Sequence, residues 1–176
     1  MNRSLALWLL GGYAFTAVFG TLLHFLYSWT GWVAVTPFSA INESTWEHMK
    51  LSFFPMFIFA IIQSSFFKEE YSNFWCVKLV GILVGLVLIP TLFYTYNGAF
   101  GKTSDWLNIL FFFLAVGIAY LVEGWFFKNG IACFAPWVAV AVLSLITLAF
   151  FVFTFSPPKL PLFLDPITKS YGLIIK

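Results

Sequence analysis

The chain has 176 residues, of which 61% are hydrophobic, 22% are aromatic and only 9% are charged. A water-soluble domain carries roughly 25% charged residues, so this composition excludes an ordinary soluble globule and predicts a protein embedded in a lipid bilayer. The formal net charge is +2 and no run of basic residues is present, so nucleic acid is not expected as a partner.

Five apolar stretches are long enough to cross the hydrocarbon core, which takes about 20 helical residues. They lack the alternating pattern of membrane β-strands, so we expect an all-α, polytopic transmembrane bundle that forms one domain over residues 1–176. The predicted spans are approximately 5–28, 46–67, 74–94, 106–127 and 131–155. The tail, 156–176, contains four prolines between positions 157 and 166 and is predicted to be non-helical.

The first apolar stretch is too long for the core of a signal peptide, so we expect it to remain as the first span. Arg3 beside this span favours a cytoplasmic N-terminus in the plasma (inner) membrane. Cys76 and Cys133 have no metal-type spacing. Buried free thiols are expected here in preference to a disulfide.

Two features of the spans concern helix packing. Gly81 and Gly85 have the spacing of small residues that allows two membrane helices to approach closely. Pro55 and Pro90 fall inside the second and third spans and are expected to bend them.

Alternating spans place the end of the first span, the loop into the second, the loop between the third and fourth, and the tail on one side of the membrane. We call this side face A and the opposite side face B. Face A holds both histidines and four of the seven acids, whereas face B has Glu69, Glu70 and Glu123. Glu123 is expected to have a structural role or to pair with Lys128. A functional pocket is therefore predicted at face A.

The polar stretch from Asn42 to Lys50 is the richest part of face A. If it is helical, Glu43, Glu47 and Lys50 form one stripe and Ser44 and His48 an adjacent pair. The predicted catalytic residues are Glu43, Glu47, His48 and, from the first span, His24. A simpler interpretation is a helix start, because Ser44 and Glu47 have the spacing of a capping box and Lys50 can pair with Glu47.

Two further sets of candidates follow from the same clustering. A divalent metal, if one is bound, is expected at His24, Glu43 and Glu47, since imidazole and carboxylate groups suit zinc. The cofactor is otherwise left open. The predicted substrate-binding residues share a position at face A, and they are Asn42, Trp46, Lys50, Tyr94, Tyr96, Asn97, Asp105, Asp165 and Tyr171.

The stretch Asn42-Glu-Ser-Thr-Trp-Glu-His-Met-Lys50 and the tail with Pro157-Pro158, Asp165-Pro166 and Tyr171-Gly172 resemble an uncharacterised family of small bacterial membrane proteins with several spans. That resemblance brings no established activity. Intramembrane CAAX-type proteases are excluded because no arginine follows Glu69-Glu70 at the required spacing. Ceramidase-like hydrolases need more histidines and more spans.

Three functions remain open from the sequence. The first is a pocket at face A that binds, and acts on, a membrane lipid or a small amphipathic substrate through histidine and carboxylate chemistry. The alternative is a small transporter or channel, formed by a homo-oligomer. The third is an accessory membrane subunit whose polar end docks a partner.

Overall fold

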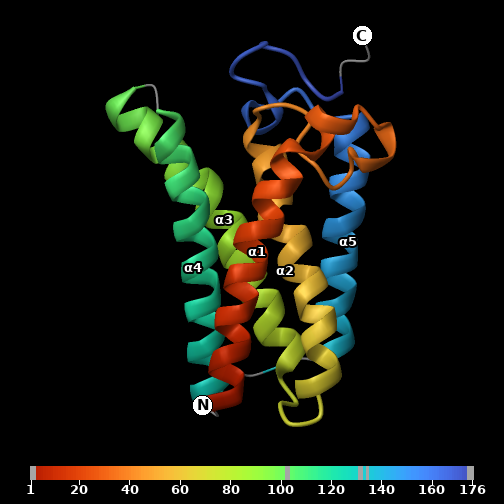
Figure 1. Cartoon of the computed structure of the whole chain (residues 1–176), viewed down its shortest axis with the longest axis vertical. Helices are drawn as coiled ribbons and strands as arrows, with labels where there is room; N and C mark the ends of the chain where they lie inside the picture. Colours follow the sequence, from red (N-terminus) through yellow and green to blue (C-terminus); the bar gives the residue numbers. More distant parts are fainter. Residues whose placement is uncertain (1–2, 102–103, 131–132, 134, 174–176) are drawn as a thin grey trace.

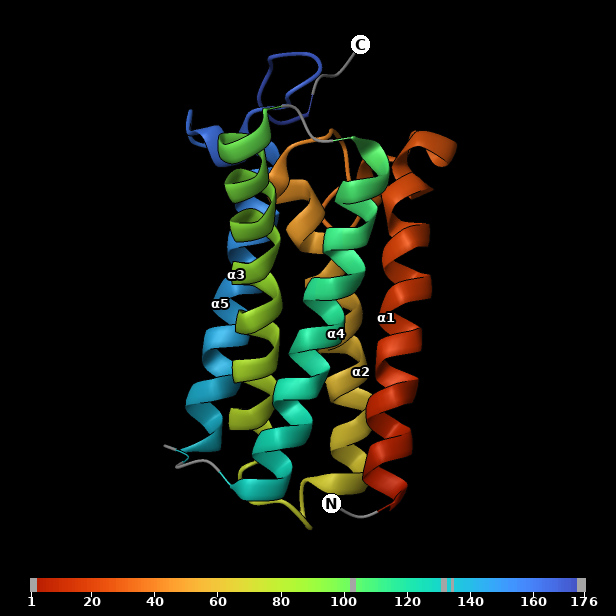
Figure 2. The same cartoon turned by 90° about the vertical axis from the view of Figure 1, so that its left-hand side faces the viewer.

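The computed structural model is an up-and-down bundle of five long helices (Figures 1 and 2). These are α1 (Arg3–Thr30), α2 (Thr45–Phe67), α3 (Phe74–Phe100), α4 (Asp105–Asn129) and α5 (Pro136–Phe155), with the one-turn 3-10 helices η1 (Val33–Val35) and η2 (Pro161–Phe163). The structure describes every residue except 1–2, 102–103, 131–132, 134 and 174–176, and the side chain of Asp105 also lies outside the described part.

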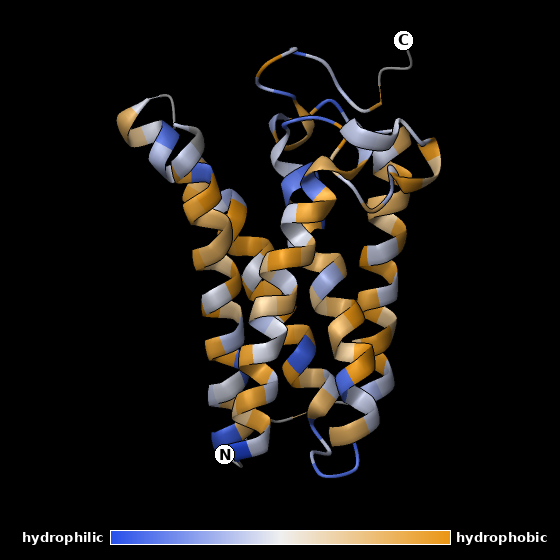
Figure 3. Cartoon of the chain, viewed as in Figure 1, coloured by the Kyte–Doolittle hydropathy of each residue, from blue (hydrophilic) through white to orange (hydrophobic). Residues whose placement is uncertain are grey.

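All five long helices have the length and hydropathy of membrane spans, which confirms the predicted all-α transmembrane fold. Figure 3 shows the helices as mainly apolar, with much of the hydrophilic surface at their ends and in the loops. Large apolar side chains point outward all around the bundle, among them Leu121, which is 74% exposed. Such a surface is stable in lipid and would aggregate in water.

Face A is the upper end of the bundle in Figure 1. The segment between α1 and α2, the C-terminal end of α3, the start of α4 and the described part of the tail lie there, whereas the start of α1 and the α2–α3 loop lie at the lower end, face B. The tail follows α5 without a further α-helix among its described residues, as its prolines predict. It contains the single 3-10 turn η2 and an antiparallel bridge between Leu164 and Tyr171.

Helix α3 packs closely against α4, and the glycines of α3 explain why. A Cβ atom added to Gly81 would lie 2.6 Å from Oε1 of Glu123, and one added to Gly85 would lie 3.6 Å from the Cβ of Ala119. The predicted close approach at these glycines is therefore confirmed. Pro55 and Pro90 lie inside α2 and α3, and both helices continue through them.

At face B, the expectation of free thiols and the expected pairing of Glu123 with Lys128 are wrong, whereas the structural role expected as the alternative for Glu123 agrees with its buried ion pair. Cys76 and Cys133 form a disulfide, which ties the start of α3 to the segment before α5. Glu123 pairs with Lys78 at 2.6 Å and not with Lys128, which is exposed. Both errors have the same origin, because each partner is brought into reach only by the packing of helices that are distant in sequence.

Candidate functional site

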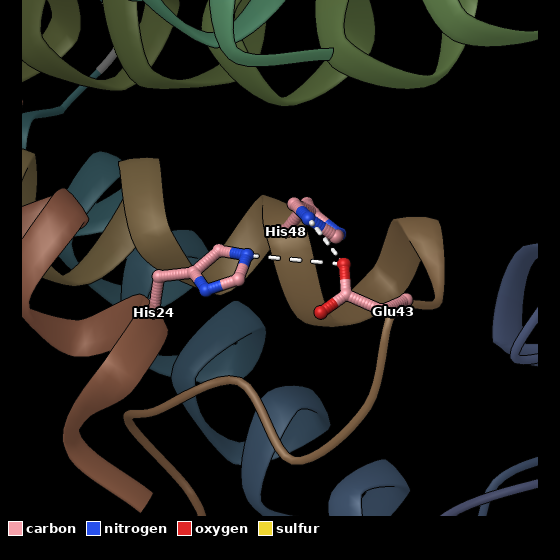
Figure 4. A group of neighbouring side chains, drawn as sticks. All are labelled: His24, Glu43 and His48. Atoms are coloured by element: carbon pink, nitrogen blue, oxygen red, sulfur yellow. Dashed lines mark ion pairs between the residues drawn. The ribbon is translucent and has the colours of Figure 1, made fainter. Parts of the chain in front are cut away.

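Three predicted site residues from two helices and a loop converge at face A. His24 comes from α1, Glu43 from the segment before α2, and His48 from the first turns of α2. Nε2 of His48 lies 3.4 Å from Oε2 of Glu43, and Nε2 of His24 lies 3.8 Å from the same oxygen. Figure 4 shows the three side chains pointing toward one another. We call this cluster the His-Glu-His trio.

The start of α2 fixes two members of the trio. Ser44 is the N-cap of α2 and accepts a hydrogen bond from the backbone N–H of Glu47 at 3.4 Å. The Asn42 side chain accepts from the N–H of Ser44 at 2.9 Å, which shapes the turn that precedes the helix. Glu43 therefore lies just outside the helix, while His48 lies one turn inside it, and both side chains reach the same place.

A buried serine holds the loop against α1 beside His24. The Ser39 hydroxyl donates to the carbonyl oxygen of Leu23 at 2.6 Å and accepts from the N–H of Tyr27 at 2.9 Å. These two backbone groups would bond to each other in a regular helix, so the hydroxyl is inserted into the hydrogen-bond ladder of α1. The N–H of Ala40 also donates to the Leu23 carbonyl, at 3.3 Å. The loop is thereby aligned with His24.

A neighbouring carbonyl group determines which ring nitrogen of His48 carries the hydrogen. Nδ1 lies 2.9 Å from the carbonyl oxygen of Ser44, and because a carbonyl can only accept, Nδ1 must carry the hydrogen. In a neutral ring, Nε2 then presents its lone pair toward the carboxylate of Glu43. Histidines that bind metals are commonly held in this way, with the second nitrogen donating to a carbonyl.

A cavity of about 570 Å³ adjoins the trio. Glu43 and His48 form part of its wall, together with Thr45, Ile89, Phe93, Asn97, Asn108, Phe111, Phe112, Pro166 and Ile167. These residues come from the segment before α2, from α2, α3 and α4, and from the tail. The cavity therefore combines apolar walls with a polar corner, and its volume is within the range of small-molecule sites, roughly 300–1,000 Å³.

A second hollow lies on the other side of Glu43, between the end of α1 and the tail. Its wall includes Tyr27, Asn42, Glu43, Asp165 and Ser170. It is bordered mainly by loop and tail residues. Glu43 thus belongs to the walls of both hollows.

Glu47 and Lys50, both predicted as site residues, are instead engaged with each other. Their ion pair is 2.5 Å long and both side chains are almost fully buried. Lys50 also donates to the carbonyl oxygen of Thr36 at 2.8 Å and to the hydroxyl of Thr154 at 3.1 Å. Glu47 accepts from the N–H of Ile41 at 3.0 Å. The pair joins the α1–α2 loop, α2 and α5, and it is not part of the trio.

Three of the remaining candidates shape the tail and attach it to the loop before α2. Asp165 is buried and accepts hydrogen bonds from Ile167 N at 2.9 Å and from the Thr168 hydroxyl at 2.6 Å, so it shapes the turn of the tail. Asn42 donates to the carbonyl oxygen of Gly172 at 3.2 Å and attaches the tail to the loop. Tyr171 forms the backbone bridge with Leu164.

Aromatic candidates contribute to packing more than to the cavity wall. Trp46 stacks among Phe150, Phe153 and Phe163 and so connects α2, α5 and the tail. The Tyr94 hydroxyl lies 3.4 Å from that of Thr45, and the Tyr96 ring contacts Phe111.

Asp105, another predicted binding residue, is the first residue of α4. Its side chain lies outside the described part of the chain.

Several wall residues were not predicted as site residues. Ile89, Phe93, Phe111 and Phe112 are indistinguishable in the sequence from the other apolar residues of their spans. Asn108 is different, because it is a polar residue inside the fourth span and so stands out in the sequence. Its Oδ1 atom is buried without a hydrogen-bond partner among the described residues.

Comparison with known proteins gives a family but no activity. No curated protein and no solved structure gave a significant match. A family model described as "Family of unknown function (DUF6512)" matches residues 1–173. Because that match covers nearly the whole sequence, the chain belongs to this family of unknown function, DUF6512.

Proposed function

We propose that the protein binds an amphipathic molecule, a membrane lipid or a lipid-like compound, in the cavity beside the His-Glu-His trio. The observation that carries the proposal is the junction of one apolar chamber with one polar cluster. Phe93, Phe111 and Phe112 form walls of the chamber, while Glu43 and His48 form its polar corner. The apolar chain of such a molecule would fit the chamber, and its polar end group would fit the polar corner.

The cavity also offers polar groups that a ligand can satisfy. Oδ1 of Asn108, a cavity residue, is buried and lacks a partner among the described residues. A buried acceptor without a hydrogen bond costs about 1–3 kcal/mol. A ligand with a donor near its polar end would recover this energy, so Asn108 favours an amphipathic occupant over a purely apolar one.

The extent of the cavity favours binding over transport. Its wall residues belong to the face-A half of the bundle, and Glu123, the acid near face B, is not among them. A transporter needs access from both sides of the membrane, whereas this cavity is connected in the described structure to face A. Histidine and carboxylate groups at the polar corner also give it the means for acid–base chemistry on the bound molecule.

For the topology, the disulfide argues against the cytoplasmic N-terminus that Arg3 suggests. Cys76 and Cys133 are joined at face B, where the N-terminus also lies. Disulfides persist in oxidising compartments and are rare in the cytosol. In our proposal the protein lies in the plasma membrane with face B on the outer side, and the trio and its cavity open toward the cytoplasm.

Native mass spectrometry of protein released from its own membranes in mild detergent tests ligand binding. The test variant is Ile89→Trp, which places a large side chain in the cavity wall. The matched control is Val87→Trp on the same helix, at a side chain that is 61% exposed on the outer surface. We expect one amphipathic molecule to be retained by the wild type and the control and lost from Ile89→Trp. Equal retention by all three, or none by the wild type, would refute the proposal.

A further inference from the structure

The trio has the composition and geometry of a metal centre. Two histidines and one glutamate are a donor set found in zinc sites that keep a fourth position open. Their ligand atoms, one from each side chain, all lie within 4.8 Å of one another. With metal–ligand bonds of 2.0–2.2 Å, the edges of a zinc tetrahedron are about 3.3–3.6 Å long. The distances of 3.4 Å and 3.8 Å from Oε2 of Glu43 to the two imidazoles are close to these edges.

The hydrogen bonding at His48 favours a cation between the three groups. Because Nδ1 donates to the Ser44 carbonyl, a neutral His48 directs a lone pair at a carboxylate oxygen 3.4 Å away. Two acceptors at this distance repel each other. A proton on Nε2 would relieve the repulsion between His48 and Glu43, but it would leave His24 without a role, since 3.8 Å is too long for a hydrogen bond.

A metal ion accounts for all three side chains at once. A proton can be shared by two atoms, whereas here three potential ligand atoms converge from α1, the loop and α2. The two imidazole rings lie edge to face with centroids 5.3 Å apart, and Nε2 of each ring faces the same carboxylate oxygen of Glu43. Glu43 is 43% exposed and the histidines are 29% and 24% exposed, which leaves a route for an ion to enter.

We infer that His24, Glu43 and His48 bind a divalent transition metal ion of the zinc type. This set differs from the one expected from the sequence, because His48 takes the place of Glu47. Because Glu43 and His48 are both wall residues of the cavity, an open fourth coordination position would be reachable from it. Water or an oxygen atom of the bound amphipathic molecule would fill it. The part of the inference that places the bound molecule beside the metal rests on the proposed function.

Metal binding is measured on the full-length protein, purified without a histidine tag and stripped with a chelator. Zinc is titrated by calorimetry, and cobalt(II) is added as a spectroscopic substitute whose visible absorption reports tetrahedral coordination. The variants are His24→Ala, Glu43→Gln and His48→Ala. The control is Glu69→Gln, an exposed carboxylate at face B. Thermal unfolding with and without zinc is recorded for every protein.

We expect about one zinc ion per chain in the wild type and the control, tetrahedral cobalt bands, and a rise in unfolding temperature on adding zinc. Each trio variant should weaken zinc binding by about 100-fold or more, since changes in the second shell alone cost 10–100-fold. Wild-type protein that binds no zinc and gains no thermal stability would overturn the inference. So would trio variants that bind zinc as the wild type does. Neither result depends on ligand retention in the Ile89→Trp experiment, so the two proposals fail separately.

Discussion

Glu47 and Lys50, three residues apart on α2, form an ion pair of 2.5 Å that is closed off from solvent. Glu43, only four residues before Glu47, is 43% exposed and faces two histidines. The carboxylates of one short segment therefore belong to two different structures. One is an internal connection between helices, and the other is part of the His-Glu-His trio.

This division predicts opposite consequences for two similar substitutions. Glu47→Gln leaves the buried ammonium group of Lys50 without its carboxylate, and breaking such a pair costs about 3–5 kcal/mol. Glu43→Gln removes a half-exposed charge and should change the free energy of unfolding by less than about 1 kcal/mol in metal-free protein. Equilibrium unfolding in detergent measures both values. Equal destabilisation by the two substitutions would mean that Glu43 also has a structural role.

The ion pair of Lys78 and Glu123 is a second internal connection, between α3 and α4. Glu123→Gln alone should destabilise the protein by about 3–5 kcal/mol, because the buried ammonium of Lys78 loses its partner. Replacing both residues together, as Lys78→Met with Glu123→Leu, should restore most of that stability, since the paired desolvation cost disappears. A double-mutant cycle of unfolding free energies checks this. If the double variant is less stable than either single variant, the two side chains also stabilise the protein through contacts other than their attraction for each other.

The position of Ser39 predicts an effect on the trio at a distance. Ser39→Ala removes the hydroxyl that holds the loop to Leu23 and Tyr27 of α1, so His24 and Glu43 are no longer aligned. Zinc affinity should fall about 10-fold, as is common for residues that support metal ligands. The control is Ser28→Ala at the same helix end, whose hydroxyl donates to the carbonyl oxygen of Phe25. Unchanged zinc affinity in Ser39→Ala would show that the loop does not need this hydroxyl for alignment.

The proposed topology predicts which loops are accessible from outside the cell. In a background in which Cys76 and Cys133 are replaced by alanine, Glu69→Cys places a thiol at face B and Ser170→Cys places one in the tail at face A. A membrane-impermeant maleimide added to intact cells should label the thiol at position 69. It should label position 170 only after the cells are opened. The reverse pattern would restore the orientation that Arg3 suggests.

The sequence was sufficient for the membrane fold because span length and hydropathy depend on residues that are adjacent in the chain. It also pointed to His24, Glu43 and His48, whose side chains the structure brings together, because polar residues near membrane spans stand out against an apolar background. Glu47 was grouped with them on the assumption that the helix includes residue 43. Helix α2 begins at Thr45 after the Ser44 cap, so the helical stripe of Glu43, Glu47 and Lys50 does not exist.

The sequence alone did not show which residues of different helices would pair. The capping box illustrates why, since Ser44 caps the helix as predicted, yet the Glu47 side chain bonds to Ile41 and Lys50. Cys76 finds Cys133 and Lys78 finds Glu123 only when α3 packs on its neighbours. The same holds for the cavity walls, whose phenylalanines differ from lipid-facing ones in position alone.

Photo-cross-linking in native membranes is the most direct test of whether the cavity holds an amphipathic molecule. A photoreactive phenylalanine analogue is introduced at Phe93, a cavity wall residue, and in a separate protein at Val87 on the outer surface of the same helix. We expect one defined amphipathic adduct at position 93 and a mixture that reflects the bulk lipids at position 87. The same bulk lipid mixture at both positions would contradict it.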